Sequence, residues 1–165
     1  MRGFLKKSRF INRILPEKAE NEYKGYKIAK ITFLIICIIS IIRSLIHFLA
    51  PDGGAESIAG IVLSIEGGEI IVAFFALWGS SQLLLALVFL IVYFRYDNLI
   101  PLMYTLIIIE YVMRIVVGRI RPFETMNVPS GAIWNFIIIP LAIVMLLLSI
   151  KQPNKQKLDI NSELQ

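Results

Sequence analysis

The chain has 165 residues, of which 57% are hydrophobic, and a formal net charge of +5. An ordinary soluble domain is roughly 45–50% apolar, so this composition argues against a soluble globular protein. The basic residues gather at the edges of apolar blocks, which argues against a nucleic-acid-binding protein. Cys37 is the single cysteine, and this count excludes both an intrachain disulfide and a cysteine-based metal site.

The first segment, residues 1–27, is basic, and nine of the seventeen Lys and Arg residues lie within the first 30 positions. On a helix, Phe4, Ile11 and Leu15 would lie along one side, with most charges on the others. This pattern is typical of a short helix that lies in the headgroup region of a membrane. The alternative is a basic tail without fixed structure, and the sequence leaves both open.

Long apolar blocks follow, and about 20 apolar residues suffice to cross the hydrocarbon core of a bilayer. The blocks predict an all-α, integral membrane four-helix bundle within residues 28–150, followed by a polar tail at 151–165. The expected spans lie at about residues 28–49, 70–94, 99–118 and 132–150.

The second half of the first span carries a polar stripe at i, i+3, i+4 and i+7, which is one helix face. Its members are Ser40, Arg43, Ser44 and His47. A polar stripe on a spanning helix should face other helices. The loop at 50–69 contains no Lys or Arg, and within it Ile58 to Ile65 could form a short interfacial helix or a re-entrant turn.

The later spans add further polar groups. Gln82 is an amide in the middle of the second span and needs a partner, for which an interhelical hydrogen bond is the simplest choice. Glu110 and Arg114 are four residues apart in the third span, so they share one helix face and can pair. In the fourth span, Asn135 lies near the start, and Pro140 predicts a kink or a free carbonyl group.

The distribution of positive charge predicts the orientation, because cytoplasmic segments carry the excess of Lys and Arg. With both termini in the cytoplasm, the inner segments hold thirteen Lys and Arg residues and the outer loops hold two, Arg119 and Arg121. An even number of spans, here four, also places both termini on the same side of the membrane. The expected location is therefore a bacterial-type inner (plasma) membrane.

This orientation brings most of the polar in-membrane groups to one level. At about 1.5 Å per residue, Glu110 and Arg43 lie roughly 9–12 Å below the outer boundary. All these groups except Gln82 fall in the outer half of the bundle. We therefore predict a polar cluster made by Arg43, His47, Glu69, Gln82, Glu110, Arg114 and Asn135.

Three roles are open for this cluster. It could be a buried ion network that fixes how the helices pair. It could be an outward-opening pocket in which Arg43 and Arg114 hold an anionic headgroup, a carboxylate or a quinone oxygen. It could be a catalytic site in which His47 acts as acid or base with Glu69 or Glu110. A metal site is not expected, because one His and scattered carboxylates do not match a known ligand spacing.

The order of motifs resembles the DoxX-like group of small four-helix bacterial membrane proteins and their uncharacterised relatives. The shared features, over about residues 28–150, are four spans, the Glu66-Gly67-Gly68-Glu69 stretch, the Trp78-Gly79-Ser80-Ser81-Gln82 step and Arg114 late in span three. Some members of that group are regarded as accessory subunits of membrane redox complexes. The resemblance therefore implies a quinone-related or partner-stabilising role.

The sequence thus favours a small membrane protein without catalytic activity, either a lipid- or small-molecule-binding module or an accessory subunit. The alternative is a membrane enzyme or redox-complex component that uses His47 and the outer-half carboxylates. We expect the lipid bilayer as a partner, with a small molecule, lipid or quinone, and a membrane protein or a second copy of the chain, as further candidates. No cofactor and no nucleic acid are expected.

Overall fold

A computed structural model of the chain describes residues 9–122, 125 and 130–152, and these contain helices and turns but no strand. The prediction of an all-α four-helix membrane bundle is confirmed. The elements in chain order are α1 (Arg9–Ile14), α2 (Lys27–Leu49), α3 (Gly68–Arg95), the 3-10 turn η2 (Asp97–Leu99), α4 (Ile100–Ile120) and α5 (Ser130–Ile150).

Four of these helices are long and apolar enough to cross a membrane, with mean hydropathies between 1.9 and 2.6. The protein is therefore a small multi-pass membrane protein. Pro101 lies in the first turn of α4, where its missing N–H leaves no hydrogen bond unmade. Pro140 lies inside α5, and the helix continues through it to Ile150.

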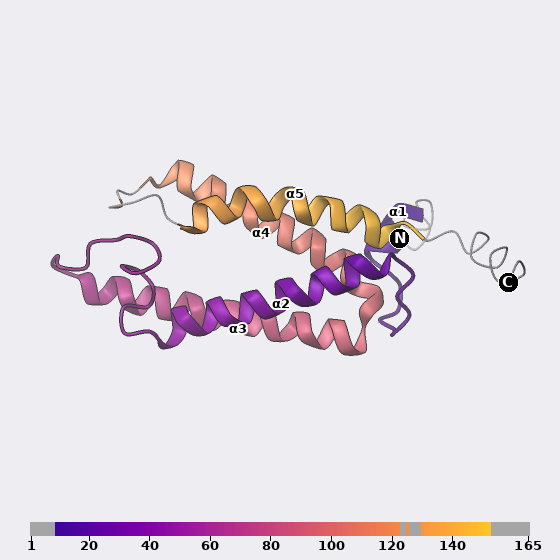
Figure 1. The fold of residues 1–165 in the computed structure, drawn as a ribbon, viewed down its shortest axis with the longest axis horizontal. Helices are drawn as coiled ribbons and strands as arrows, with labels where there is room; N and C mark the ends of the chain where they lie inside the picture. Colours follow the sequence, from indigo (N-terminus) through magenta and orange to yellow (C-terminus); the bar gives the residue numbers. More distant parts are fainter. Residues whose placement is uncertain (1–8, 123–124, 126–129, 153–165) are drawn as a thin grey trace, which may run out of the picture.

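The bundle consists of two helical hairpins, α2 with α3 and α4 with α5 (Figure 1). The hairpins meet at one end of the molecule and separate toward the other. We call the first the strap end, which carries α1, η2 and the end of α5. We call the second the loop end, which carries the 50–67 loop, the start of α3 and the end of α4.

The hydrophobic core lies where the hairpins meet. Phe33 of α2 packs against Phe89 of α3 and Tyr104 of α4, with 5.6 Å between ring centroids in both pairs. Tyr104 is fully buried, and its hydroxyl donates to the carbonyl of Ala29 at 2.7 Å. A buried tyrosine usually needs such a partner. This contact joins α4 to the first turns of α2.

Residues 9–26, the N-terminal strap, fold across the strap end (Figure 1). Arg13 donates to the carbonyl of Ile150 at 2.6 Å, and the N–H of Tyr26 donates to the carbonyl of Leu148 at 3.1 Å. The side chain of Asn98 exchanges hydrogen bonds with the backbone of Lys18 and Glu20. The strap therefore ties the α3–α4 turn to the end of α5.

An ion pair lies beneath the strap. The ammonium of Lys30 is 2.6 Å from the carboxylate of Asp97, which is almost fully buried. For the first 27 residues the sequence allows an interfacial helix or a tail without fixed structure, and residues 1–8 of this segment, with Phe4, lie outside the described residues. The structure shows a helix of six residues, Arg9–Ile14, and then a segment fastened to the bundle by polar contacts.

Candidate functional site

Glu110 and Arg114 pair within α4, and the pair reaches across to the other hairpin. Arg114 Nη2 and Nε both donate to Glu110 Oε1. Nη2 also donates to the amide oxygen of Gln82 on α3 at 3.3 Å. The partner that the sequence requires for Gln82 is thus the arginine of the facing helix.

Trp78 of α3 lies at the centre of the same group. Its ring centroid is 4.9 Å from the guanidinium carbon of Arg114 and 5.7 Å from that of Arg43 on α2. Arg114 also lies 5.1 Å from the ring of Tyr111. The sequence identifies both arginines but not these rings, although Trp78 precedes Gln82 by one helical turn. We call the group the arginine–tryptophan cluster: Arg43, Trp78, Gln82, Glu110, Tyr111 and Arg114.

The charges of this cluster do not balance. Among the residues that the structure describes, Arg114 pairs with Glu110, whereas Arg43 forms no ion pair. A charged arginine in the middle of a membrane helix costs at least about 2.5–3.5 kcal/mol. A cation–π contact returns only about 0.5–2 kcal/mol. The stacking of Arg43 on Trp78 therefore offsets part of this cost.

A small cavity adjoins the cluster between α2, α3 and α4. Arg43, Gln82, Glu110 and Tyr111 line it together with apolar side chains. Its volume is about 10 Å³, which is about the space that one water molecule needs. In this state, the cluster therefore encloses room for a water but not for a larger ligand.

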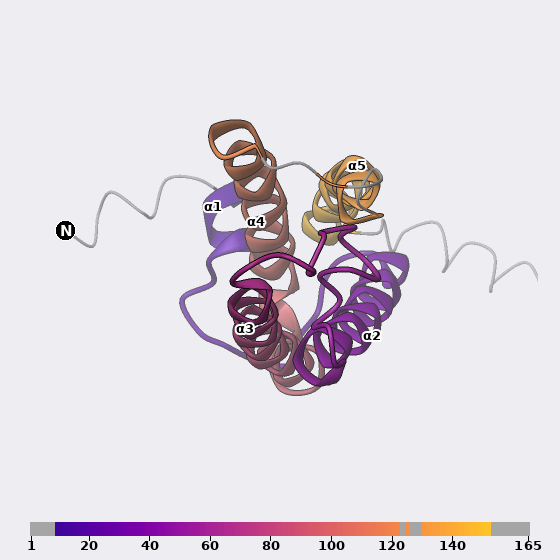
Figure 2. The same ribbon diagram turned by 90° about the vertical axis from the view of Figure 1, so that its left-hand side faces the viewer.

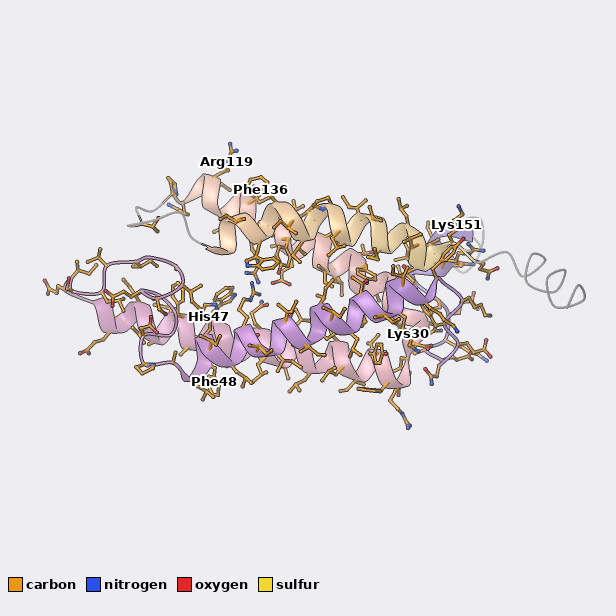
Figure 3. The ribbon with its side chains drawn as sticks, viewed as in Figure 1. Lys30, His47, Phe48, Arg119, Phe136 and Lys151 are labelled. Carbon is orange, nitrogen blue, oxygen red and sulfur yellow. The ribbon has the colours of Figure 1, made fainter. Side chains whose placement is uncertain are left out.

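His47 is buried beside the cluster and holds the 50–67 loop. Its Nδ1 lies 2.7 Å from the carbonyl oxygen of Gly53, and its ring centroid lies 4.8 Å from that of Trp78. Figure 3 shows His47 on the side of α2 that faces the other hairpin, whereas Phe48 points away. A hydrogen bond from Nδ1–H to the carbonyl fixes the ring and its tautomer.

Helices α2 and α3 pack closely at this level. A Cβ atom at Gly79 would lie 2.7 Å from both the Cβ of His47 and the backbone nitrogen of Phe48. Only a glycine allows the two backbones to approach so closely. His47 and Trp78 are therefore held on one rigid hairpin.

The 50–67 loop is fastened at its start. The carboxylate of Asp52 accepts hydrogen bonds from the N–H groups of Gly54 at 2.9 Å and Ser57 at 2.8 Å. These bonds to the charged form lower the pKa of Asp52 to about 2. The stretch from Ile58 to Ile65, for which the sequence allows a short interfacial helix or a re-entrant turn, contains no helix: turns cover residues 51–59, and irregular backbone with bends follows to Ile65. Viewed from the loop end, the loop lies across the space between the helices (Figure 2).

Two predicted members lie apart from the cluster. Glu69 is exposed in the first turn of α3. It precedes Trp78 by nine residues, which is roughly 13 Å along a helix. Asn135 is partly buried on α5, and the structure gives it no hydrogen bond to the cluster. The contacts that define the cluster come from three helices, α2, α3 and α4.

Within the described ranges, no three His, Cys, Asp or Glu side chains come together in a way that could hold a metal ion. Comparison of the chain with protein-family models, curated proteins and solved structures finds no match. The resemblance to the DoxX-like group therefore stays a prediction, and the functional argument depends on the geometry of the cluster.

Proposed function

We propose that this membrane protein is a binding module, without catalytic activity, that holds a lipid or another small membrane-soluble molecule at the arginine–tryptophan cluster. One observation carries the proposal. Charged, amide and aromatic side chains of three helices meet inside the apolar part of the bundle, between the two hairpins.

The position of the cluster supports binding rather than a purely structural network. Small residues let helix backbones approach closely, and polar side chains that hydrogen-bond across the interface can fix helix pairing. Here α2 and α3 already pack closely through Gly79, whereas Arg114 reaches across from the separate α4–α5 hairpin. Separation of the hairpins would enlarge the cavity without breaking either hairpin.

The contacts of His47 fix the position of its ring. Nδ1 is engaged with the carbonyl oxygen of Gly53, and the ring packs against Phe75 and Trp78. Action as a general base would require the other ring nitrogen, Nε2, to reach a reacting group. These contacts support a positioning role for His47 at the edge of the proposed binding site.

Native mass spectrometry of the gently extracted protein tests the proposal. The wild type should carry a bound small molecule, and Trp78→Leu and Gln82→Leu should lose it while circular dichroism stays helical. Trp134→Leu is the matched control, because Trp134 is an exposed tryptophan on α5. Wild-type protein that emerges without ligand from mild detergent and from nanodiscs, or variants that keep the ligand, would contradict the proposal.

We also propose that both termini face the cytoplasm of a bacterial-type inner membrane. The strap and the end of α5 lie at the same end of the bundle (Figure 1), and the excess of the Lys and Arg residues that the structure describes lies there. In a Cys37→Ser background, Ser57→Cys should react with an impermeant maleimide on intact cells. Gln152→Cys should react only after lysis, and the reverse order would refute this orientation.

A further inference from the structure

We infer that the ligand of the arginine–tryptophan cluster is an anionic amphiphile that enters from the lipid side of the bundle. Its acidic group, a phosphate or a carboxylate, would lie against the guanidinium of Arg43. This inference rests on the proposed function and adds the chemical class of the ligand and its route.

The first argument is charge. Of the two arginines that face Trp78, only Arg114 has a carboxylate partner among the described residues. Glu110 also lines the cavity that Arg43 borders, but this carboxylate is the partner of Arg114. The described part of the cluster therefore carries one excess positive charge within the apolar layer. An anion is the ligand that balances it, and a guanidinium binds phosphate and carboxylate groups through paired N–H donors.

The second argument is that the guanidinium of Arg43 can be reached. The structure gives no hydrogen bond from the guanidinium of Arg43, and no side-chain nitrogen or oxygen atom in the described residues is both fully buried and without a partner, so these nitrogens are not fully buried. The side chain of Arg43 is partly exposed and borders the cavity. A ligand would therefore bind a donor that is already present at the cavity, without unfolding either hairpin.

The third argument concerns the route. From the loop end, the 50–67 loop lies across the space between the helices (Figure 2). Asp52 and His47 fasten this loop to itself and to α2. Exposed apolar side chains are close to both arginines along the chain: Ile39, one turn before Arg43, is 47% exposed, and Met113, which precedes Arg114, is 61% exposed. An acyl chain that contacts the Ile39 side of α2 would bring its headgroup to the level of Arg43.

Quenching of Trp78 fluorescence by brominated lipids tests the inference. Trp134→Phe leaves Trp78 as the sole tryptophan, and this protein is reconstituted in phosphatidylcholine vesicles. Brominated phosphatidylglycerol supplies a phosphate anion, a brominated fatty acid supplies a carboxylate, and brominated phosphatidylcholine is the zwitterionic control. At least one anion should quench at a several-fold lower mole fraction than the control, and the more effective one identifies the headgroup.

Arg43 should decide this preference. In the Trp134→Phe background, Arg43→Gln should reduce the preference for the anion at least fivefold, whereas Arg43→Lys should retain most of it. Arg95→Gln removes an exposed arginine at the strap end and should change nothing. Circular dichroism checks that each variant is folded. If Arg43→Gln does not fold, Arg43→Lys tests the role of the charge.

The failures are distinguishable. The anionic assignment fails if phosphatidylcholine quenches saturably and as strongly as both anions. It also fails if folded Arg43→Gln keeps an unchanged preference for the anion. Either result would leave a binding site in place. The absence of saturable quenching by every lipid, together with ligand-free protein in native mass spectrometry, would overturn the proposed function itself.

Discussion

The strap end and the arginine–tryptophan cluster both place charged groups next to an apolar core, but they treat these groups differently. At the strap end, Lys30 is paired with Asp97, and Arg13 donates to a helix-terminal carbonyl. In the cluster, two arginines face one glutamate among the described residues. At the strap end, charged groups with partners close the bundle. In the cluster, Arg43 has no ion-pair partner among the described residues and borders the cavity.

The largest expected effect comes from breaking the strap end. Asp97→Ala leaves Lys30 without its carboxylate under the strap. Removal of one partner from a fully buried pair costs about 3–5 kcal/mol, and partial exposure of Lys30 reduces the expectation to about 2–3 kcal/mol. Titration with SDS, followed by circular dichroism, measures the loss. Glu22→Ala, which breaks the exposed Lys24–Glu22 pair, is the control and should be close to neutral.

Glycine substitutions compare the loop-end halves of the two hairpins. Gly79→Ala should destabilise the protein by about 1–3 kcal/mol, because the added methyl meets the backbone of α2. Gly118→Ala meets no atom within 4 Å and should be neutral or stabilising by at most about 1 kcal/mol. The same SDS titration separates the two. Equal effects would show that α4 also packs closely at the loop end.

The ion pair of the cluster should show strong coupling. Glu110→Gln leaves Arg114 without its carboxylate beside Arg43, and we expect a loss of about 2 kcal/mol, since a partly buried charge loses its partner. The double variant Glu110→Gln with Arg114→Gln should lose less stability than the sum of the losses of the two single variants. A double-mutant cycle measures this coupling, and additive losses would mean that the pair contributes nothing to stability.

His47 should affect the loop more than the bundle. His47→Phe keeps an aromatic ring beside Trp78 but leaves the carbonyl of Gly53 without its donor. We expect a local loss of about 1–2 kcal/mol, seen as faster hydrogen exchange over residues 53–59 with little change at the strap end. Uniform acceleration across the whole bundle would instead assign His47 a global structural role.

The smallest effect is the pH dependence of the loop. Hydrogen bonds from Ser57 and, to a smaller extent, Gly54 lower the pKa of Asp52 to about 2. The stabilisation is therefore fully present above the ordinary aspartate pKa of about 4 and is lost as the pH falls through about 2. NMR chemical shifts of the Ser57 amide should follow this titration, and Asp52→Asn should abolish it. A midpoint near 4 would show that these bonds do not favour the charged form.

The sequence predicts much of the architecture and part of the site. Apolar blocks of membrane length and the polar breaks between them determine the four long helices, because both properties are local. The four-residue spacing determines that Glu110 and Arg114 share a face. The role of Trp78 is not predictable in the same way, because an aromatic residue in an apolar span carries no signal of which cation will lie over it.

The sequence by itself determined that this chain forms membrane-length helices and that charged side chains lie within them. Tertiary structure alone decided that Glu69 and Asn135 stay apart from the cluster, that Trp78 joins it, and that residues 9–26 fasten the strap end. The physical reason is that helical periodicity fixes neighbours along one helix. The separation of two hairpins, the crossing at Gly79 and the path of the strap depend on contacts between residues far apart in the chain.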